Sequence, residues 1–209
     1  MKRSDDMRNY LKTVSIILVL ISLCTLLSCG KKKYTEGLEY YLLDDGSYAV
    51  GMGEGVLERN VVIPAEHNGR AVTEIIEEGF TCSSIVSITI PDSVTKIGES
   101  AFACCYSLET VKLPAELREI CSFAFRECGS LRQVILPEKL ETLGSYVFIH
   151  CDGIEKIYIP KSLKNFDKNF LDRIAHDADI YYAGSQQEWE DMGLKVGSFN
   201  YFDSVLTYD

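Results

Sequence analysis

Hydrophobic positions recur along most of the chain with a period of about 23 residues, within the range of known repeat proteins. Three series share this spacing: Cys82, Cys105, Cys128 and Cys151; Ile85, Leu108, Leu131 and Ile154; and Ile88, Val111, Val134 and Ile157. Phenylalanines follow it more loosely, at Phe80, Phe102, Phe125, Phe148 and Phe170. A fixed period of about 20 to 29 residues with apolar positions predicts a solenoid of stacked coils.

The prolines mark one end of a short strand in each unit. All five share one register, at Pro64, Pro91, Pro114, Pro137 and Pro160. In one unit, Leu108, Val111 and Leu113 fit the L-x-x-L-x-L signature of leucine-rich repeats. The alternating Val-Lys-Leu stretch predicts a strand, and the following proline ends it because proline has no N–H for the ladder.

The second half of each unit predicts the return of the coil. Leu117 and Ile120 lie three residues apart, which indicates a helical or turn-like return. A sixth rung without a proline is expected at Ile180 and Tyr182, one full repeat beyond Ile157 and Ile159. Each coil has one apolar side, so it has to stack on a neighbour to bury that side.

The unit from Ile88 to Cys105 reads Ile-Thr-Ile-Pro-Asp-Ser-Val-Thr-Lys-Ile-Gly-Glu-Ser-Ala-Phe-Ala-Cys-Cys. It resembles the BspA-type (Treponema-type) leucine-rich repeat, and the resemblance covers about residues 35–209. The resemblance implies an α/β-type repeat solenoid with short parallel strands on one face, about six 23-residue coils, an N-terminal β-hairpin cap and a C-terminal helix/strand cap. The repeats are placed at residues 61–183. Two departures are a cysteine, Cys121, where other units have glycine, and a missing asparagine ladder.

The segment before the repeats predicts an N-terminal β cap over residues 37–60. Leu38 to Val50 has the pattern of a hairpin, and Asp45-Gly46 is a strong signal for a type I′ turn. The first interval between prolines is four residues longer than the others, and residues 66–69 are interpreted as a loop insertion there.

The segment after the repeats predicts a C-terminal cap over residues 184–209. Ser185 and Glu188 have the spacing of a capping box, which predicts a short helix that Gly193 can end. The sole tryptophan, Trp189, is expected to cover the last coil, and carbohydrate stacking is the alternative.

The segment 1–28 has the layout of a secretory signal peptide. Basic residues precede an uncharged run of about 16 residues, which is short for a transmembrane helix of about 20. The run ends in Leu-Leu-Ser-Cys29-Gly, which resembles a bacterial lipobox. That resemblance implies acylation of the Cys29 sulfur and cleavage before it, and an uncleaved anchor is the alternative. We therefore expect a signal peptide at 1–28, a lipidated tether at 29–36, and an extracytoplasmic protein anchored to the cell membrane, facing the cell surface or a periplasm.

The charge balance argues against a nucleic-acid partner. The chain has a formal net charge of -10, and residues 1–28 contribute +2, so the remainder carries about -12. An acidic surface repels phosphate backbones.

Six cysteines remain after the leader and the lipid site are set aside. An exported domain invites a disulfide interpretation. Stacked coils, however, hold equivalent side chains about 4.8 Å apart, whereas the Cβ atoms of a disulfide prefer about 3.8 Å. We expect a ladder of buried thiols at Cys82, Cys105, Cys128 and Cys151, and the period leaves Cys104 and Cys121 undetermined.

Little in the sequence indicates catalysis. His67 is interpreted as a solvated loop residue, and His150 adjoins Cys151, but adjacent side chains point apart and do not form a dyad. His176 has no recognisable partner. No nucleophile elbow, HExxH or phosphate-loop motif is present. We therefore expect no enzyme activity, no cofactor and no metal.

The outward positions of the strands form the candidate ligand-binding site. They are Thr89, Lys112, Ile135, Tyr158 and Tyr181, and they become apolar toward the C-terminal end. Tyrosine is favoured at interfaces, so Lys112, Ile135, Tyr158 and Tyr181 are the predicted site. The alternative is that aromatic residues simply suit strands.

Two functions fit this surface. The family resemblance implies adhesion or recognition of a protein partner, either host matrix or envelope protein. The alternative is a structural or accessory envelope scaffold without an outside ligand. Six rungs at about 4.8 Å each make a sheet only about 30 Å long, which is small for an adhesin. The sequence leaves the ligand and the oligomeric state open.

Overall fold

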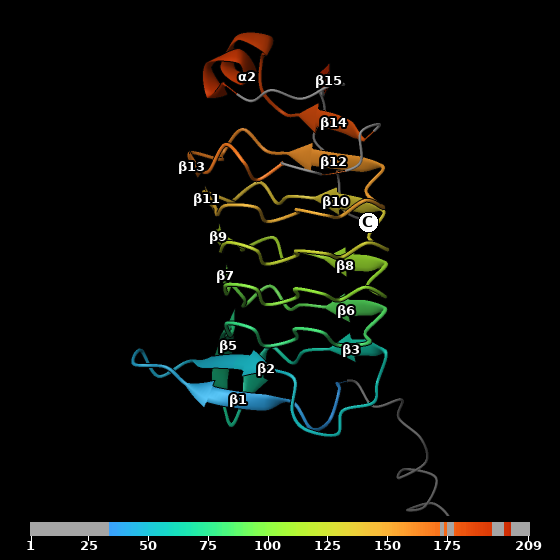
Figure 1. Cartoon of the computed structure of the whole chain (residues 1–209). Coiled ribbons are helices and arrows are strands. Elements are labelled where there is room, and N and C mark those ends of the chain that lie inside the picture. The colour runs from blue at the N-terminus through green and yellow to red at the C-terminus, as the bar shows by residue number, and fades with distance from the viewer. Residues whose placement is uncertain (1–33, 172–173, 175–177, 194–198, 202–209) are drawn as a thin grey trace, which may run out of the picture. The chain divides into compact units, whose positions relative to one another are not determined.

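A computed structural model describes residues 34–171, 174, 178–193 and 199–201. The predicted signal peptide, Cys29 and His176 lie outside these residues. The described chain forms a stack of coils with two lines of short parallel strands (Figure 1). The predicted repeat solenoid is confirmed.

The line of strands predicted from the prolines is called the front face here. It consists of β3 (Asn60–Val62), β6 (Ser87–Thr89), β8 (Thr110–Lys112), β10 (Gln133–Ile135), β12 (Lys156–Ile159), β14 (Asp179–Tyr182) and β15 (Phe199–Tyr201). Its paired strands are parallel, and three of the pairings have the 23-residue offset of the repeat: β6 with β8, β10 with β12, and β12 with β14. The offset is 27 residues between β3 and β6 and 19 residues between β14 and β15. The sixth rung is present as β14, and β15 is the strand of the predicted C-terminal helix/strand cap.

The return of each coil is turn-like and adds a second line of strands, the rear face. After the N-terminal hairpin it consists of β5 (Arg70–Ile75), β7 (Lys96–Ile97), β9 (Glu119–Ile120), β11 (Thr142–Leu143) and β13 (Asn165–Phe166). Leu117 N–H donates to the Pro114 carbonyl at 3.1 Å, and Ile120 lies in β9. A turn followed by a strand therefore produces the spacing of three that resembled a helix.

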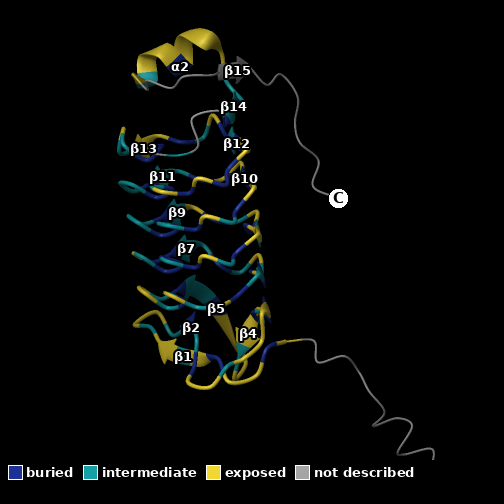
Figure 2. Ribbon diagram, turned by 45° about the vertical axis from the view of Figure 1, so that its right-hand side comes forward, coloured by how far each residue is buried: buried dark blue, intermediate teal, exposed yellow. Residues whose placement is uncertain are grey.

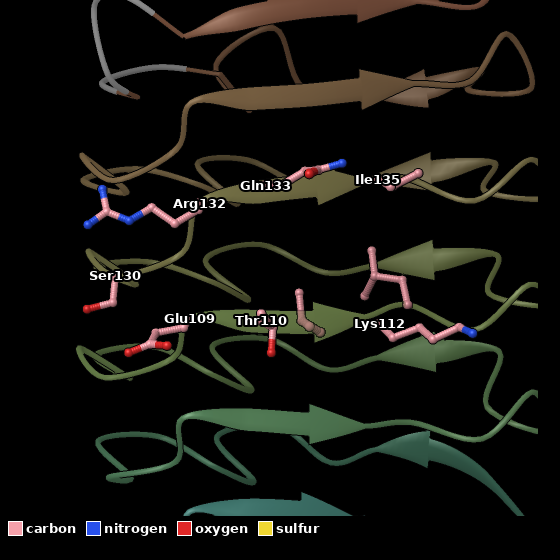
Figure 3. A pocket seen from close by; sticks show the side chains of 9 residues that line it. Glu109, Thr110, Lys112, Ser130, Arg132, Gln133 and Ile135 are labelled. Atoms are coloured by element: carbon pink, nitrogen blue, oxygen red, sulfur yellow. The ribbon is translucent and has the colours of Figure 1, made fainter. Parts of the chain in front are cut away.

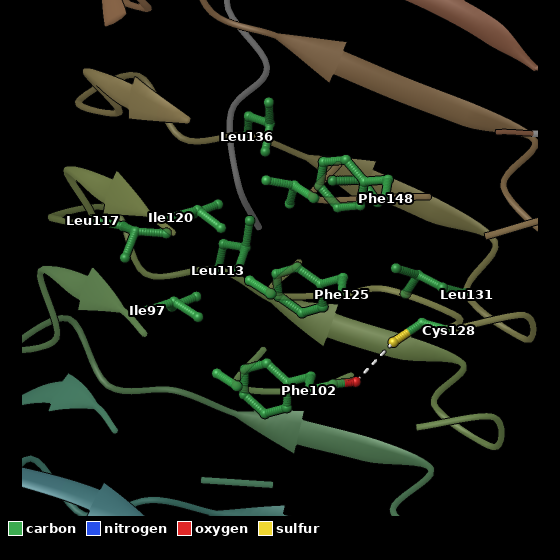
Figure 4. Packing of buried hydrophobic residues seen from close by; sticks show 14 of the residues in the cluster. Ile97, Phe102, Leu113, Leu117, Ile120, Phe125, Cys128, Leu131, Leu136 and Phe148 are labelled. Carbon is green, nitrogen blue, oxygen red and sulfur yellow. Dashed lines mark hydrogen bonds between the residues drawn. The ribbon is translucent and has the colours of Figure 1, made fainter. Parts of the chain in front are cut away.

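A column of phenylalanines fills the interior. Phe80, Phe102, Phe125, Phe148 and Phe170 are fully buried. Ring centroids of the first four are 5.3, 5.1 and 5.7 Å apart in succession, and the rings are nearly parallel. Figure 4 shows aliphatic side chains from both faces packed around this column. Each ring packs against the ring of the adjacent coil, so the stability of every coil depends on its neighbours.

The N-terminal cap contains the expected hairpin, with β1 (Glu39–Leu42) antiparallel to β2 (Tyr48–Gly51). The predicted type I′ turn is wrong. Five residues join the strands, and only Gly46 among them has a positive φ, of 84°. A type I′ turn needs a positive φ at both central residues. Asp45 instead accepts hydrogen bonds from the backbone and hydroxyl of Ser47, at 2.9 and 2.6 Å.

The type I′ geometry occurs where a loop insertion was expected. β4 (Glu66–His67) pairs antiparallel with β5 across a two-residue turn, in which Asn68 and Gly69 have φ of 51° and 74°. His67 is therefore not a solvated loop residue. Its ring stacks on Tyr40 with centroids 3.8 Å apart and meets Tyr48 edge-on at 5.0 Å.

The C-terminal cap has the predicted helix, α2 (Gln186–Met192). The Ser185 and Glu188 capping box is complete, and its hydrogen bonds from Ser185 lower the pKa of Glu188. Gly193 ends the helix at φ 68°. Trp189 is buried against Tyr182, which confirms its capping role and leaves its ring little room to stack on a sugar.

Both β1 and α2 are largely exposed at the two ends of the stack (Figure 2). The part of the chain that the structure describes contains no helix with the length and hydrophobicity of a transmembrane span.

Three of the four cysteines expected in the buried ladder occupy it. Cys105, Cys128 and Cys151 are fully buried, and their thiols donate to phenylalanine carbonyls at 3.0, 3.2 and 2.9 Å. The prediction is wrong for Cys82, which is exposed. Cys82 follows its phenylalanine by two residues, whereas the other three follow theirs by three. The ladder position in that coil is Ser83, whose hydroxyl lies 3.3 Å from the Cys105 sulfur.

Candidate protein-binding surface

The predicted outward row lies in register on the front face. Thr89 is the strand partner of Lys112. In the upper part of the face Ile135 is the partner of Tyr158, and Tyr158 is the partner of Tyr181. Thr89 and Lys112 are exposed, while the three residues above them are half-buried. The row therefore changes from polar to apolar toward the C-terminal cap, as expected.

The two tyrosines form a stacked pair on this face. Their ring centroids are 4.6 Å apart and the ring planes differ by 11°. Partial desolvation, followed by the Asp179 carboxylate, raises the pKa of Tyr181, and its hydroxyl lies 3.4 Å from an Asp179 oxygen. The stacked rings cover each other's facing sides and have polar groups at their edge, and tyrosine side chains of this amphipathic kind are enriched at protein interfaces.

The front face divides into two sheets between β8 and β10. β3, β6 and β8 form one sheet, and β10, β12, β14 and β15 form the other. At other steps the residue before a strand donates to the coil below, as Glu109 N–H does to the Val86 carbonyl at 2.9 Å and Glu155 N–H to the Arg132 carbonyl at 2.8 Å. Within the described residues, no such backbone bond joins Arg132 to Glu109. The rear strands β9 and β11 remain paired at this level, so the stack opens on the front face alone.

A pocket of about 570 Å³ lies at this opening. Its lining consists of Glu109, Thr110, Val111, Lys112, Leu113, Ser130, Arg132, Gln133 and Ile135. Figure 3 shows Glu109, Ser130 and Arg132 at one end of the two strands, and Lys112 and Ile135 at the other. Val111 is only half-buried, whereas its counterparts Ile88 and Val134 are buried. The floor of the pocket is therefore apolar and its rim is polar.

The rim carries charges of both signs. Arg132 lies 3.8 Å from Glu155, and both side chains are mostly exposed. An exposed ion pair of this kind contributes at most about 1 kcal/mol, so either partner can turn toward a ligand at little cost. Lys112 and Glu109 supply a further cation and anion on β8 or next to it. The rim therefore offers a ligand both positively and negatively charged groups for ion pairs and hydrogen bonds.

Two of the four predicted site residues, Lys112 and Ile135, line the pocket. Tyr158 and Tyr181 lie beyond it on the same row, because Ile135 is the strand partner of Tyr158. Sequence reasoning missed the pocket itself. It also missed a second stacked pair, Phe123 and Tyr146, whose centroids are 5.7 Å apart.

The other candidate groups do not come together into a reactive centre. Cys151 is buried with its thiol bound to the Phe125 carbonyl, while His150 is exposed. His67 stacks within the N-terminal cap. Among the described residues, no three His, Cys, Asp or Glu side chains are placed to hold a metal ion.

The repeat also matches a known family. Six copies of the BspA type leucine rich repeat region match residues 60–175, which is more than half of the chain. The chain belongs to the BspA-type leucine-rich repeat family. The resemblance found in the sequence is thereby confirmed. As a BspA-type protein, the chain has a fold that generally serves as a repeat scaffold for protein contacts.

Solved structures agree with this BspA-type assignment. The chain is similar to the T. pallidum leucine-rich repeat protein, with a TM-score of 0.66 and 28% identity over 70% of this chain and 69% of that one. A leucine-rich repeat protein from Bacteroides capillosus aligns at TM-score 0.53 and 27% identity, over 65% of this chain and 99% of that one. The pneumococcal vaccine antigen PcpA shares the fold at TM-score 0.59 and 17% identity, over 85% of this chain and 49% of that one. No curated protein matched the chain.

Proposed function

We propose that this chain is a lipid-anchored extracytoplasmic recognition protein that binds a protein partner with the upper half of its front face. The observation that carries this proposal is that the pocket and the outward row lie next to each other and share residues. The pocket between β8 and β10 shares Lys112 and Ile135 with the row that ends in the stacked Tyr158 and Tyr181.

This arrangement supports a protein ligand. The opening between β8 and β10 leaves backbone groups that a ladder would otherwise use, and a partner can hydrogen-bond to them. The adjoining aromatic pair offers a rigid contact area, and the mixed rim charges offer orientation. The chain is proposed to be non-enzymatic and to need no cofactor, since among the described residues no three His, Cys, Asp or Glu side chains are placed to hold a metal ion, and the exposed His150 does not pair with the buried Cys151.

The start of the fold supports a position close to the membrane. Thr35 is buried, its N–H donates to the Val62 carbonyl at 3.0 Å, and its hydroxyl accepts from Val62 N–H at 2.9 Å. If Cys29 carries the lipid, the free tether ends at Thr35 and spans at most about 20 Å. We therefore propose that the tether, predicted at residues 29–36, is held from Thr35 onward.

This short tether also favours the second candidate, an accessory subunit beside another envelope protein. Protease treatment of intact cells separates the two functions. Release of the domain supports recognition of an outside partner, whereas protection supports an internal one.

The binding assignment is tested by a pull-down with the lipid-free domain. The bait is incubated with host matrix proteins and with envelope proteins of the producing cell. A matched bait with Tyr158→Ser and Tyr181→Ser should lose the specific partner. Equal capture by the two baits would remove the tyrosine pair from the proposal.

A further inference from the structure

Cys82 and Cys104 occupy equivalent positions on adjacent coils. Each follows a residue of the phenylalanine column by two positions, and Phe80 and Phe102 stack at 5.3 Å. Both cysteines have a left-handed backbone, with φ of 56° and 58°, so their Cα–Cβ bonds point alike. The Cys82 N–H donates to the carbonyl of Ala103 at 2.8 Å, which joins the two turns directly.

These two thiols differ from the buried ladder in exposure and in partners. Cys82 is exposed and Cys104 is half-buried. The ladder thiols at Cys105, Cys128 and Cys151 are fixed by bonds to backbone carbonyls inside the core. Surface side chains exchange rotamers freely, whereas the packed interior holds each side chain in one rotamer.

The spacing of the two turns suits a disulfide. Equivalent atoms on adjacent coils lie about 4.8 Å apart, and disulfide-bonded cysteines have Cα atoms about 4.4 to 6.8 Å apart. Partial desolvation, and then a hydrogen bond with Cys104, raises the pKa of Cys82. Rotation about χ1 moves the two sulfur atoms but not the Cβ atoms, so closing the bond also requires the two exposed turns to approach each other by up to about 1 Å. The packed core does not permit such a shift for the ladder thiols.

Cys104 is less exposed than Cys82, so we assign it to the second step, in which it completes the bond. Its sulfur is positioned by two polar neighbours, since Arg126 Nη2 donates to it at 3.7 Å and its thiol donates to the Glu127 carboxylate, also at 3.7 Å. The same carboxylate accepts from the Tyr106 hydroxyl at 2.9 Å and lies 3.3 Å from Arg126 Nε.

We propose that Cys82 and Cys104 are a redox-sensitive pair that closes to a disulfide when it meets a low-molecular-weight disulfide such as oxidised glutathione. The exposed Cys82 attacks the reagent, forms a mixed disulfide and releases one thiol. The Cys104 sulfur then attacks the Cys82 sulfur and expels the second thiol. Two protein thiols are oxidised and one external disulfide is reduced to two thiols, so hydrogens and electrons balance. The product links the first two cysteine-bearing turns of the solenoid.

Oxidised glutathione and peptide mapping test this pairing. The mature protein in detergent is incubated with the reagent, its remaining thiols are alkylated, and it is digested with trypsin without reduction. We expect one cross-linked species that joins the peptide 71–96, which contains Cys82, to the peptide 97–112, which contains Cys104. It should lose the two hydrogens of the thiols and separate on reduction.

Three variants fix the assignment. Cys104→Ser should abolish the cross-link and leave glutathione attached to Cys82, because no resolving thiol remains. Cys82→Ser should abolish both products, and the control Cys121→Ser should form the cross-link as the wild type does. The proposal is overturned if the wild type keeps Cys82 reduced, if it stops at the mixed disulfide, or if the cross-link persists in Cys104→Ser through Cys105.

Discussion

Tyr158 and Tyr181 stack with ring centroids 4.6 Å apart, although a full repeat separates them in the chain. Their contact follows directly from the repeat, which places equivalent residues of β12 and β14 side by side. Because the contact lies on the face that opens at the pocket, the pair joins the architecture of the solenoid to its proposed function.

Replacing both rings should separate binding from folding. Tyr158→Ser with Tyr181→Ser removes a stacked pair that lies on the surface of the front face, so the loss of stability should be small. We expect an unchanged circular dichroism spectrum, a slightly lower denaturation midpoint and loss of the partner. Unfolding of the double variant would show instead that the rings serve the fold.

The column of rings gives a sharper test of the core. Phe125→Ala removes a fully buried ring and should lower the free energy of unfolding by about 3–5 kcal/mol. Phe123→Ala is the matched control, since Phe123 is half-buried, has φ of 59° and stacks only at the surface on Tyr146. Urea denaturation should show a much smaller loss for the control. Similar losses would contradict the assignment of the two phenylalanines to interior and surface.

Two glycines should differ in their tolerance of a methyl group. A Cβ at Gly144 would lie 2.4 Å from the Ser122 nitrogen of the coil below, whereas a Cβ at Gly129 would meet open space. Gly144→Ala should therefore lower the free energy of unfolding by about 1–3 kcal/mol through overpacking. Gly129→Ala should leave the urea midpoint nearly unchanged. Equal midpoints for the two variants would mean that the coils can separate locally without loss.

The cysteines should react with thiol reagents in an order set by burial. Burial raises the pKa of Cys105, and a hydrogen bond with Cys151 followed by burial raises the pKa of Cys128. Because these thiols are buried and the thiolate is the reactive form, they should resist iodoacetamide at pH 8 in the folded protein. The pKa of Cys82 is also raised, but Cys82 should be modified first because it is exposed to the reagent. Timed alkylation followed by mass spectrometry measures this order. Early modification of Cys128 would contradict the ladder.

The periodic part of the fold was predictable because each coil repeats one packing solution. The apolar series determined the coils, the strands and the outward row ending in Tyr181, and the capping box determined α2. Cys82 was misplaced because the regular repeat count was applied to a coil in which Phe80 and Phe102 are one residue closer than the period. The spacing of the phenylalanines is the signal that could have corrected it.

Other features depend on tertiary contacts that a repeat pattern does not contain. The type I′ turn fell at Asn68-Gly69 and not at Asp45-Gly46, because Asp45 is held by Ser47. The opening between β8 and β10 has no sequence signal that we can identify. Val111 and Val134 are the same residue type, yet only Val134 is buried.

Site-specific photocross-linking tests the central claim most directly. Benzoylphenylalanine is introduced in place of Tyr158 in the full chain, expressed in cells that present it at the membrane, with the same substitution at the exposed Tyr41 of the N-terminal cap as control. On irradiation, the Tyr158 position should give a discrete protein adduct that the Tyr41 position does not give. Adducts of equal yield at both positions, or an adduct at Tyr41 alone, would contradict a binding surface on the front face.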